Sequence, residues 1–294
     1  MIRVGTAGWS YADWEGTVYP RSKPPGFHAL QYLAPFMSTV EINSSFYAIP
    51  PERNAAAWVQ RVRDHPDFRF TAKLFRGFTH DEPESRERMQ AMCDDYRRGV
   101  EPLRSAGRLG GVLAQFPASY RPGPRAWRRL EWICDQFSGL GLIAEVRHLA
   151  WFEPPALRRL EALPLSVACI DLPAAPEHPT LETPTPGPVG YLRLHGRNSA
   201  AWFDAKAHRD QKYDYLYGSD EIRAMVATAK RLATGRDQTY VITNNHFSGK
   251  ALANAIQIQS GLDGERTTAP ANLYDAYPAL ADGWDRAGQN ELFS

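Results

Sequence analysis

Residues 142–147 read LIAEVR, a short apolar run that ends in charged side chains. Because alternate residues of a β-strand point to the same side, such a run is expected to place Glu145 and Arg147 on one face. Eight runs of this kind occur, and seven of them carry polar or charged groups at the carboxyl end. They are Ile2 to Gly8, Thr39 to Asn43, Phe68 to Lys73, Gly110 to Gln115, Leu142 to Arg147, Leu165 to Asp171, Val189 to His195 and Gln238 to Asn245.

Segments with helical periodicity lie between these runs, with apolar residues spaced three and four positions apart. They are Phe27 to Met37, Glu52 to Arg63, Glu84 to Ser105, Pro124 to Phe137, Pro155 to Ala162, Ser219 to Ala233 and Phe247 to Ser260. Ser219 is the expected N-cap of its helix, because its hydroxyl can accept a hydrogen bond from a free backbone amide. Strands that alternate with helices predict a parallel sheet built through right-handed crossovers.

Eight such units in 294 residues favour an α/β fold of the TIM type, a (β/α)₈ barrel, over an open doubly wound sheet. No G-x-G-x-x-G motif follows the first run, which disfavours a dinucleotide-binding sheet. The segment from Leu172 to Pro188 contains six prolines and no helical stripe, so the sixth crossover is expected to be irregular. The whole chain, residues 1–294, is predicted to form one domain.

The composition disfavours several classes of protein. With 34 basic and 33 acidic residues the formal net charge is +1, so there is no polybasic field and nucleic acid is a disfavoured partner. Cys93, Cys134 and Cys169 form no C-x-x-C pair and are expected to be reduced thiols of a cytoplasmic protein. No apolar run reaches the roughly 18 residues that a membrane helix needs, so no membrane association is predicted.

Charged residues at the carboxyl ends of the strands should meet at one end of such a barrel, where active sites of this fold lie. They are Glu41, Lys73, Glu145, Arg147, Asp171, Arg193 and His195. Each unpaired buried ion costs several kcal/mol, so these groups must pair, face water or meet a ligand. For any single residue a structural ion pair explains the pattern equally well. For all the strands together a ligand site is favoured, since aliphatic side chains could close a purely structural barrel end.

The residue types suggest an enzyme that binds a small anionic or phosphorylated substrate and acts by acid/base chemistry, as a hydrolase, a lyase or an isomerase. Arginine binds phosphate or carboxylate through paired hydrogen bonds, and histidine titrates near neutrality. The residues assigned to catalysis are Glu41, Glu145, His195, Lys73 and Asp171. Those assigned to substrate binding are Trp9, Asn43, Tyr47, His80, Gln115, Arg147, Arg193, Asn244 and Asn245.

Other interpretations stay open at this point. Asn244 and Asn245 either contribute to a phosphate site at the start of the last helix or cap that helix. A divalent metal held by Glu41, Glu145, Asp171 and His195, as in isomerase and endonuclease barrels, is the second choice, and the cofactor is otherwise unknown. The competing function is a protein that binds a nucleotide or the end of a single nucleic-acid strand without turnover. A glycosidase acid pair is a weaker hypothesis.

Several short motifs resemble the YecE-like family, known as domain of unknown function 72, over nearly the whole chain. The motifs are Gly5-Thr6-Ala7-Gly8-Trp9-Ser10-Tyr11 with Trp14 and Tyr19-Pro20, Glu41-Ile42-Asn43-Ser44-Ser45-Phe46-Tyr47, Phe70 to Lys73 with Thr79-His80, Gln115-Phe116-Pro117, Glu145-Val146-Arg147-His148 with Trp151-Phe152, Arg193-Leu194-His195-Gly196 and Asn244-Asn245-His246. The family often has Thr where this chain has Ser45, a change that keeps a hydroxyl. The resemblance implies a TIM-type barrel and does not imply a reaction.

Overall fold

A parallel β-sheet forms the centre of the computed structural model, which describes residues 1–265 and 267–280. Each predicted strand is present in this part of the chain, with ends shifted by a few residues. The strands are β1 (Ile2–Ala7), β2 (Thr39–Ile42), β3 (Arg69–Lys73), β4 (Leu109–Gln115), β5 (Leu142–Glu145), β6 (Ser166–Val167), β7 (Cys169–Asp171), β8 (Val189–Leu194) and β9 (Gln238–Thr243). Every pairing between neighbouring strands is parallel.

The sheet closes through the sixth predicted strand, which the structure divides into β6 and β7 around Ala168. The strand order runs from β6 through β5, β4, β3, β2, β1, β9 and β8 to β7, so its two ends are consecutive pieces of one chain segment. β6 pairs with β5 and β7 pairs with β8, while the amide of Ala168 donates to the carbonyl of Ala144 at 2.9 Å. The predicted TIM-type barrel is therefore confirmed.

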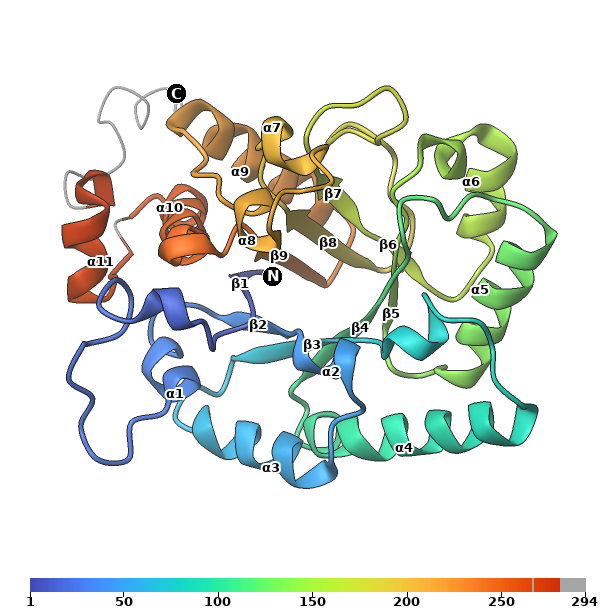
Figure 1. Cartoon of the computed structure of the whole chain (residues 1–294), viewed down its shortest axis with the longest axis horizontal. Helices are drawn as coiled ribbons and strands as arrows, with labels where there is room; N and C mark the ends of the chain where they lie inside the picture. The colour runs from blue at the N-terminus through green and yellow to red at the C-terminus, as the bar shows by residue number, and fades with distance from the viewer. Residues whose placement is uncertain (266, 281–294) are drawn as a thin grey trace.

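Helices cover the outside of the barrel (Figure 1), with α3 and α4 along one side, α5 and α6 along the next, and α9 and α10 opposite. The α-helices are α1 (Ala29–Leu33), α2 (Ser44–Tyr47), α3 (Glu52–Arg61), α4 (Arg86–Ser105), α5 (Pro124–Gln136), α6 (Pro154–Glu161), α7 (Ser199–Trp202), α8 (Arg209–Lys212), α9 (Ser219–Ala233), α10 (Lys250–Asp263) and α11 (Ala271–Ala276). Short 3₁₀ turns cover Ala12–Trp14, Arg76–Phe78, Leu149–Phe152, Phe247–Gly249 and Pro278–Leu280. Among the described residues no helix is long and apolar enough to cross a membrane.

Two helix starts differ from the prediction. Gly218, rather than Ser219, is the N-cap of α9, and the Glu221 side chain accepts a hydrogen bond from the Gly218 amide at 2.9 Å. The last predicted helix begins at Lys250 instead of Phe247, because Ser248 and Gly249 adopt left-handed backbone angles that break the helical path. The irregular sixth crossover is present as expected, since residues 172–188 form no helix or strand.

The alternation of side chains along each strand separates two apolar regions. Val40, Ile42 and Phe70 point outward and pack in the large cluster beneath the helices. The interior is filled by residues of the opposite parity, namely Ala7, Leu113, Ile143, Ala168, Ile170, Leu172, Tyr191, Tyr240 and Ile242. Because every second residue of a strand points inward, the next inward positions after Ile143 and Tyr191 are Glu145 and Arg193. The polar site thus lies directly above this interior layer.

Candidate functional site at the carboxyl end of the barrel

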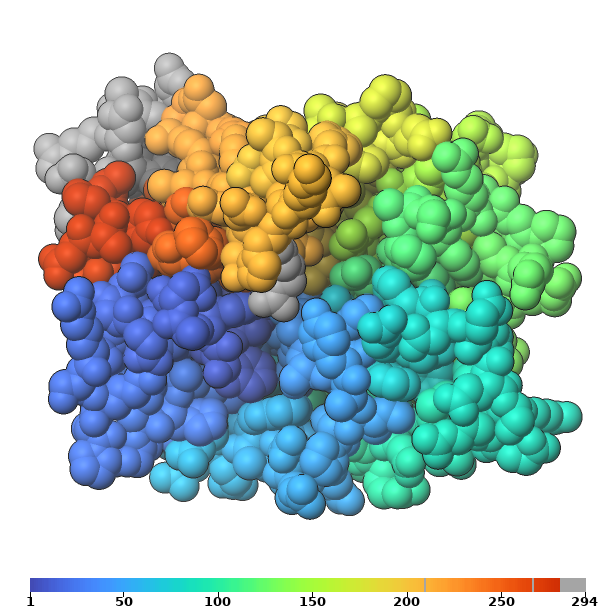
Figure 2. All heavy atoms as spheres, viewed as in Figure 1, coloured from blue at the N-terminus to red at the C-terminus, as the bar shows by residue number. Residues whose placement is uncertain are grey.

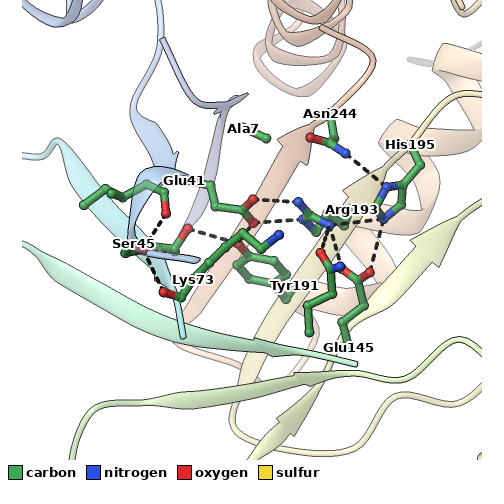
Figure 3. Close-up of polar contacts among 12 residues, drawn as sticks. Ala7, Glu41, Ser45, Lys73, Glu145, Tyr191, Arg193, His195 and Asn244 are labelled. Atoms are coloured by element: carbon green, nitrogen blue, oxygen red, sulfur yellow. Dashed lines mark hydrogen bonds and ion pairs between the residues drawn. The ribbon is translucent and has the colours of Figure 1, made fainter. Parts of the chain in front are cut away.

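Eight polar side chains continue the inward-facing rows at the carboxyl ends of the strands, and we call them the mouth cluster. They are Glu41, Lys73, Gln115, Glu145, Arg147, Arg193, His195 and Asn244. Figure 3 shows several of them converging from different strands onto Arg193. Figure 2 shows the face that carries α2, α7 and α8, the helices that follow β2 and β8, and the surface between them is hollowed.

Arg193 is the centre of the mouth cluster. Its Nε and Nη2 donate to the two carboxylate oxygens of Glu41 at 2.9 and 2.7 Å, and its Nη1 donates to Glu145 at 2.8 Å. Nη1 also lies 3.2 Å from the Gln115 side-chain oxygen. Burial alone would lower the pKa of Arg193, but Glu41 and Glu145 together hold it well above its ordinary value. Arg193 therefore joins strands β2, β4 and β5 to β8 as a permanent cation.

Glu145 accepts hydrogen bonds from two arginines. One oxygen faces Arg193, while the other accepts from Arg147 Nε at 2.7 Å and lies 3.4 Å from His195 Nε2. Burial alone would raise the pKa of Glu145, but Arg193 and Arg147 hold it well below its ordinary value. A carboxylate held in this way stays ionised at neutral pH and is a poor proton donor.

His195 is fully buried between the strands. The Asn244 amide nitrogen lies 3.1 Å from Nδ1, while Nε2 lies 3.4 Å from Glu145 and 3.3 Å from Arg193 Nη1. The contacts with Asn244 and Glu145 are both satisfied by the tautomer that carries its proton on Nε2. Burial lowers the pKa of His195 to about 3, against the opposing effect of Glu145. The imidazole is therefore neutral at physiological pH, and its Nε2 lies beside Oε1 of Glu145, the same oxygen that binds Arg147.

Lys73 is the cation of the mouth cluster that no carboxylate among the described residues binds. Its Nζ lies 4.1 Å from the centre of the Phe46 ring, and among the described residues it has no hydrogen bond or ion pair. The backbone of Lys73 is held firmly, because its carbonyl accepts from Ser45 Oγ at 2.7 Å and from the Tyr96 hydroxyl at 2.9 Å. The hydroxyl kept at position 45 thus connects the end of β2 to the end of β3.

His80 lies beside this lysine. Its ring contacts Phe46 edge to face at 5.0 Å between centroids, and its Nδ1 is 2.9 Å from Thr79 Oγ1. Burial, followed by the charge of Lys73, lowers the pKa of His80 to about 4. Asn43 follows β2 as the first residue before α2, and its buried Oδ1 has no hydrogen-bond partner among the described residues. His80 therefore adjoins Lys73 through Phe46, and Asn43 leaves one buried acceptor unsatisfied.

Asp171 does not join the mouth cluster, although the sequence analysis placed it there. Ile170 and Leu172 occupy the inward positions, so Asp171 points outward to the helix layer. Its two oxygens accept from Arg197, with a shortest distance of 2.7 Å, and from the Tyr217 hydroxyl at 2.6 Å. Arg197 also binds Glu221 of α9 at 2.9 Å. Asp171 therefore fastens β7 to α9.

Asn245 also faces outward, while Asn244 faces His195. The Asn245 amide donates to Asn254 and to the Tyr215 carbonyl, both at 2.8 Å. Neither asparagine caps α10, whose N-cap is Gly249. The Ser248 amide, at the expected phosphate position, donates to the Asp13 carboxylate at 2.5 Å. The chain thus places its own carboxylate where the sequence analysis expected a phosphate to bind.

The aromatic residues that surround the cluster are mainly ones that the sequence analysis did not assign. Trp9 packs edge to face on Trp58, and the side chain of Tyr47 is 59% exposed. The residues that contact the cluster are instead Phe46 over Lys73, Tyr191 below Glu41, and Trp202 and Tyr213 beside His195. The alternation of side chains along a strand would have identified Tyr191, because it lies two residues before the inward-facing Arg193. Trp202 ends the short helix α7 and Tyr213 follows the short helix α8, and no local pattern predicts where these two short helices lie.

Two further features bear on ligands. Among residues 1–265 and 267–280, no three His, Cys, Asp or Glu side chains lie close enough to hold a metal ion. Asp171, one of the four metal ligands considered from the sequence, lies outside the cluster.

A groove of about 770 Å³ lies on the outer surface between α4 and α5, lined by Met89, Tyr120 and Trp132 among exposed charged residues. No residue of the mouth cluster lines this groove.

Sequence comparison relates this chain to one family of known proteins. The family described as "Protein of unknown function DUF72" matches residues 3–276. The chain is 29% identical to UPF0759 protein YunF of Bacillus subtilis (strain 168) over 285 residues, which cover 93% of this chain and 99% of YunF. It is 28% identical to UPF0759 protein YecE of Escherichia coli (strain K12) over 158 residues, about half of each protein.

Solved structures of DUF72 proteins have a similar fold. A DUF72 family protein of Thermotoga maritima MSB8 aligns with a TM-score of 0.75 and 30% identity, covering 90% of this chain and 99% of that one. A DUF72 family protein of Enterococcus faecalis V583 aligns with a TM-score of 0.77 and 25% identity, covering 90% and 96%. The barrel described above is therefore shared with these proteins, whose names state no reaction.

Proposed function

The chain belongs to the DUF72 family of proteins of unknown function, and on that premise we propose that it is an enzyme acting on a small anionic, polar substrate by acid/base chemistry. The substrate would bind at the mouth cluster. The observation that carries the proposal is the charge of this cluster. It holds two carboxylates, Glu41 and Glu145, and three basic side chains, Lys73, Arg147 and Arg193. One anionic group of a ligand would neutralise the remaining positive charge when Lys73 is protonated.

Burial divides the mouth cluster into two levels. Glu41, Glu145 and His195 are 0% exposed, and each of them contacts the Arg193 guanidinium group. Above them, the Arg147 side chain is 13% exposed and Lys73 is 7% exposed. A ligand entering from the mouth would therefore reach Arg147 and Lys73 first, and the deeper level would act through them by holding their positions.

Each exposed residue then has a role that its chemistry supports. Arg147 uses Nε and Nη2 to bind Glu145, while its Nη1 has no partner among the described residues and would donate to the anion. Lys73 would act as the catalytic base, because burial and the charge of Arg193 lower its pKa to about 7. Glu145 and His195 would be positioning residues that hold Arg147 and Arg193.

A thermal-shift screen against phosphorylated and carboxylated metabolites tests the proposal. A bound ligand at a hundred times its Kd stabilises the protein by about 2.7 kcal/mol, which raises Tm by several degrees. We expect at least one compound to do so, and Arg147→Ala to abolish the shift because it removes the anion contact. Arg104→Ala is the control, since Arg104 also binds a glutamate with two nitrogens but lies exposed on α4.

The stabilising compound should then be incubated with the protein and followed by mass spectrometry. Conversion in the original protein and its loss in Lys73→Met would support catalysis. Stabilisation by no compound in the panel, or a full shift in Arg147→Ala, would reject the proposed site. Binding without any conversion would favour the non-catalytic ligand-binding function instead.

A further inference from the structure

Lys73 is unusual because it is a buried amine that forms no ion pair with either carboxylate of the mouth cluster. Glu41 is bound by Arg193 and the Tyr191 hydroxyl, and Glu145 is bound by Arg193 and Arg147. Both carboxylates are therefore engaged by other donors. The Lys73 ammonium instead lies over the face of an aromatic ring, where it has lost most of its hydration without gaining an ion pair.

The position of this amine is defined by rigid parts of the fold. Lys73 is the last residue of β3, in register with Leu113 of β4, and Ser45 and Tyr96 fix its carbonyl from two sides. Figure 3 shows its side chain directed toward Glu41 and Arg193 in the interior of the mouth. An amine held on a strand end in this way can meet a substrate atom repeatedly in the same geometry.

We propose that Lys73 Nζ forms an imine with the carbonyl carbon of an anionic aldehyde or ketone whose charged group binds Arg147. This inference rests on the proposed function, because it assumes that an anionic substrate binds at the same site, and it replaces the role of Lys73 as a base by that of a nucleophile. It narrows the substrate class to small oxo acids and related anionic carbonyl compounds. It also favours lyase or isomerase chemistry over hydrolysis, because an iminium group withdraws electrons from the bonds next to it.

The covalent step needs no further reactant. The Nζ lone pair attacks the carbonyl carbon, the C=O π pair moves to oxygen, and one proton passes from the nitrogen to that oxygen to give a neutral carbinolamine. The hydroxyl then takes up a proton and leaves as water while the nitrogen lone pair forms the C=N bond, which gives the iminium cation, and loss of the remaining N–H proton releases one proton again and gives the neutral imine. A neutral amine and a carbonyl compound thus give an imine and water, and protonation of the imine nitrogen gives the iminium cation.

The surrounding charges suit both stages of this reaction. Burial, followed by Arg193, lowers the pKa of Lys73 to about 7, so much of the amine is neutral near neutral pH. Arg147 adds to this effect, while Glu41 and Glu145 oppose it. Once formed, the iminium cation would restore the positive charge opposite these two carboxylates. The pKa of the neighbouring His80 imidazole is lowered to about 4, so this ring stays neutral at the pH where Lys73 titrates and adds no positive charge beside the iminium cation.

Reductive trapping tests the inference on the full-length chain. The protein is incubated at neutral pH with glyoxylate and cyanoborohydride, and the modified lysines are mapped by peptide mass spectrometry. We expect Lys73 to be modified about tenfold or more faster than the exposed Lys230, because the lowered pKa of Lys73 leaves much of its amine neutral and able to attack a carbonyl carbon. Acetaldehyde, an uncharged carbonyl probe, should show much weaker preference for Lys73.

Variants and a second measurement separate the possible results. Arg147→Ala should lower the rate at Lys73 about tenfold and leave Lys230 unchanged. Modification of Lys73 at no more than the Lys230 rate in the original protein would overturn the inference, and this result does not depend on any variant folding. If anions still raise Tm in that case, the proposed function stands without the imine. Fast modification of Lys73 at the same rate in Arg147→Ala as in the original protein would support the imine and reject Arg147 as the anion site.

Discussion

At the scale of single residues, Arg193 illustrates how a buried ion is made tolerable. All three of its guanidinium nitrogens donate to carboxylates, and Glu41 and Glu145 come from opposite sides of the guanidinium group. Taking such ions out of water costs several kcal/mol each, and only near-ideal geometry repays that cost. The network therefore depends on every member, since removal of one carboxylate leaves a buried cation without compensation.

Glu145→Gln tests this dependence. The amide keeps the shape of the side chain but leaves Arg147 without a carboxylate and Arg193 with Glu41 alone, so we expect the free energy of unfolding to fall by about 3–5 kcal/mol. Urea denaturation followed by circular dichroism measures the change. Glu131→Gln is the matched control, because Glu131 pairs with Arg159 on the exposed surface, and its midpoint should stay close to that of the original protein. A similarly small loss of stability for Glu145→Gln would show that the buried network does not depend on the charge of Glu145.

At the scale of the secondary-structure elements, the close approach of β1 and β2 requires a glycine. A Cβ atom on Gly5 would lie 1.7 Å from the carbonyl oxygen of Thr39, its partner in the sheet. Backbone cannot move aside as a flexible side chain can, so any larger residue would separate the two strands. β1 and β2 carry Ala7 and Glu41 at their carboxyl ends, also in register, so such a separation would displace a residue of the mouth cluster.

Gly5→Ala is accordingly expected to destabilise the barrel strongly. Overpacking of this kind costs about 1–3 kcal/mol in favourable cases and more when backbone must shift. Gly123→Ala serves as the comparison, because a Cβ at Gly123 meets nothing within 4 Å and its backbone is extended. Thermal unfolding should show a large fall in Tm for Gly5→Ala alone. Equal melting temperatures for the two variants would mean that β1 and β2 can move apart without cost.

At the scale of the whole molecule, the charge is balanced and the mouth cluster holds only a small excess. The formal net charge of the chain is +1. A nucleic-acid strand binds through several cations along its backbone, and its affinity falls steeply as salt rises. A small ligand with one anionic group matches the mouth cluster better, because a single charge balances Lys73, Arg147 and Arg193 against the two carboxylates.

We therefore expect a fluorescently labelled single-stranded oligonucleotide to show no measurable affinity at low salt. Fluorescence anisotropy measures this directly, and any compound that raises Tm in the metabolite screen provides the positive control for a functional site. Binding that weakens sharply as salt is added, and that Arg147→Ala reduces, would contradict the expectation and favour the nucleic-acid interpretation.

The sequence by itself determined the barrel and most of the inward-facing polar residues. The period of two along a strand is a local property, so Glu41, Glu145, Arg193 and His195 could be assigned to one face without coordinates. The same rule, applied from the inward Ile170, would have turned Asp171 outward. Helix ends were less predictable, because Ser248 and Gly249 break the path to α10 through backbone angles that no apolar pattern records.

Only the tertiary structure decided which charges pair and which remain available. Arg193 binds Glu41, which lies 152 positions earlier in the chain, and Glu145, which lies 48 positions earlier, and such choices depend on distances across the closed barrel. Closure also brought Phe46 over Lys73 and left that amine without a carboxylate. A residue's chemistry is local, but its partners depend on where the rest of the chain places them, since electrostatic energy changes with separation and burial.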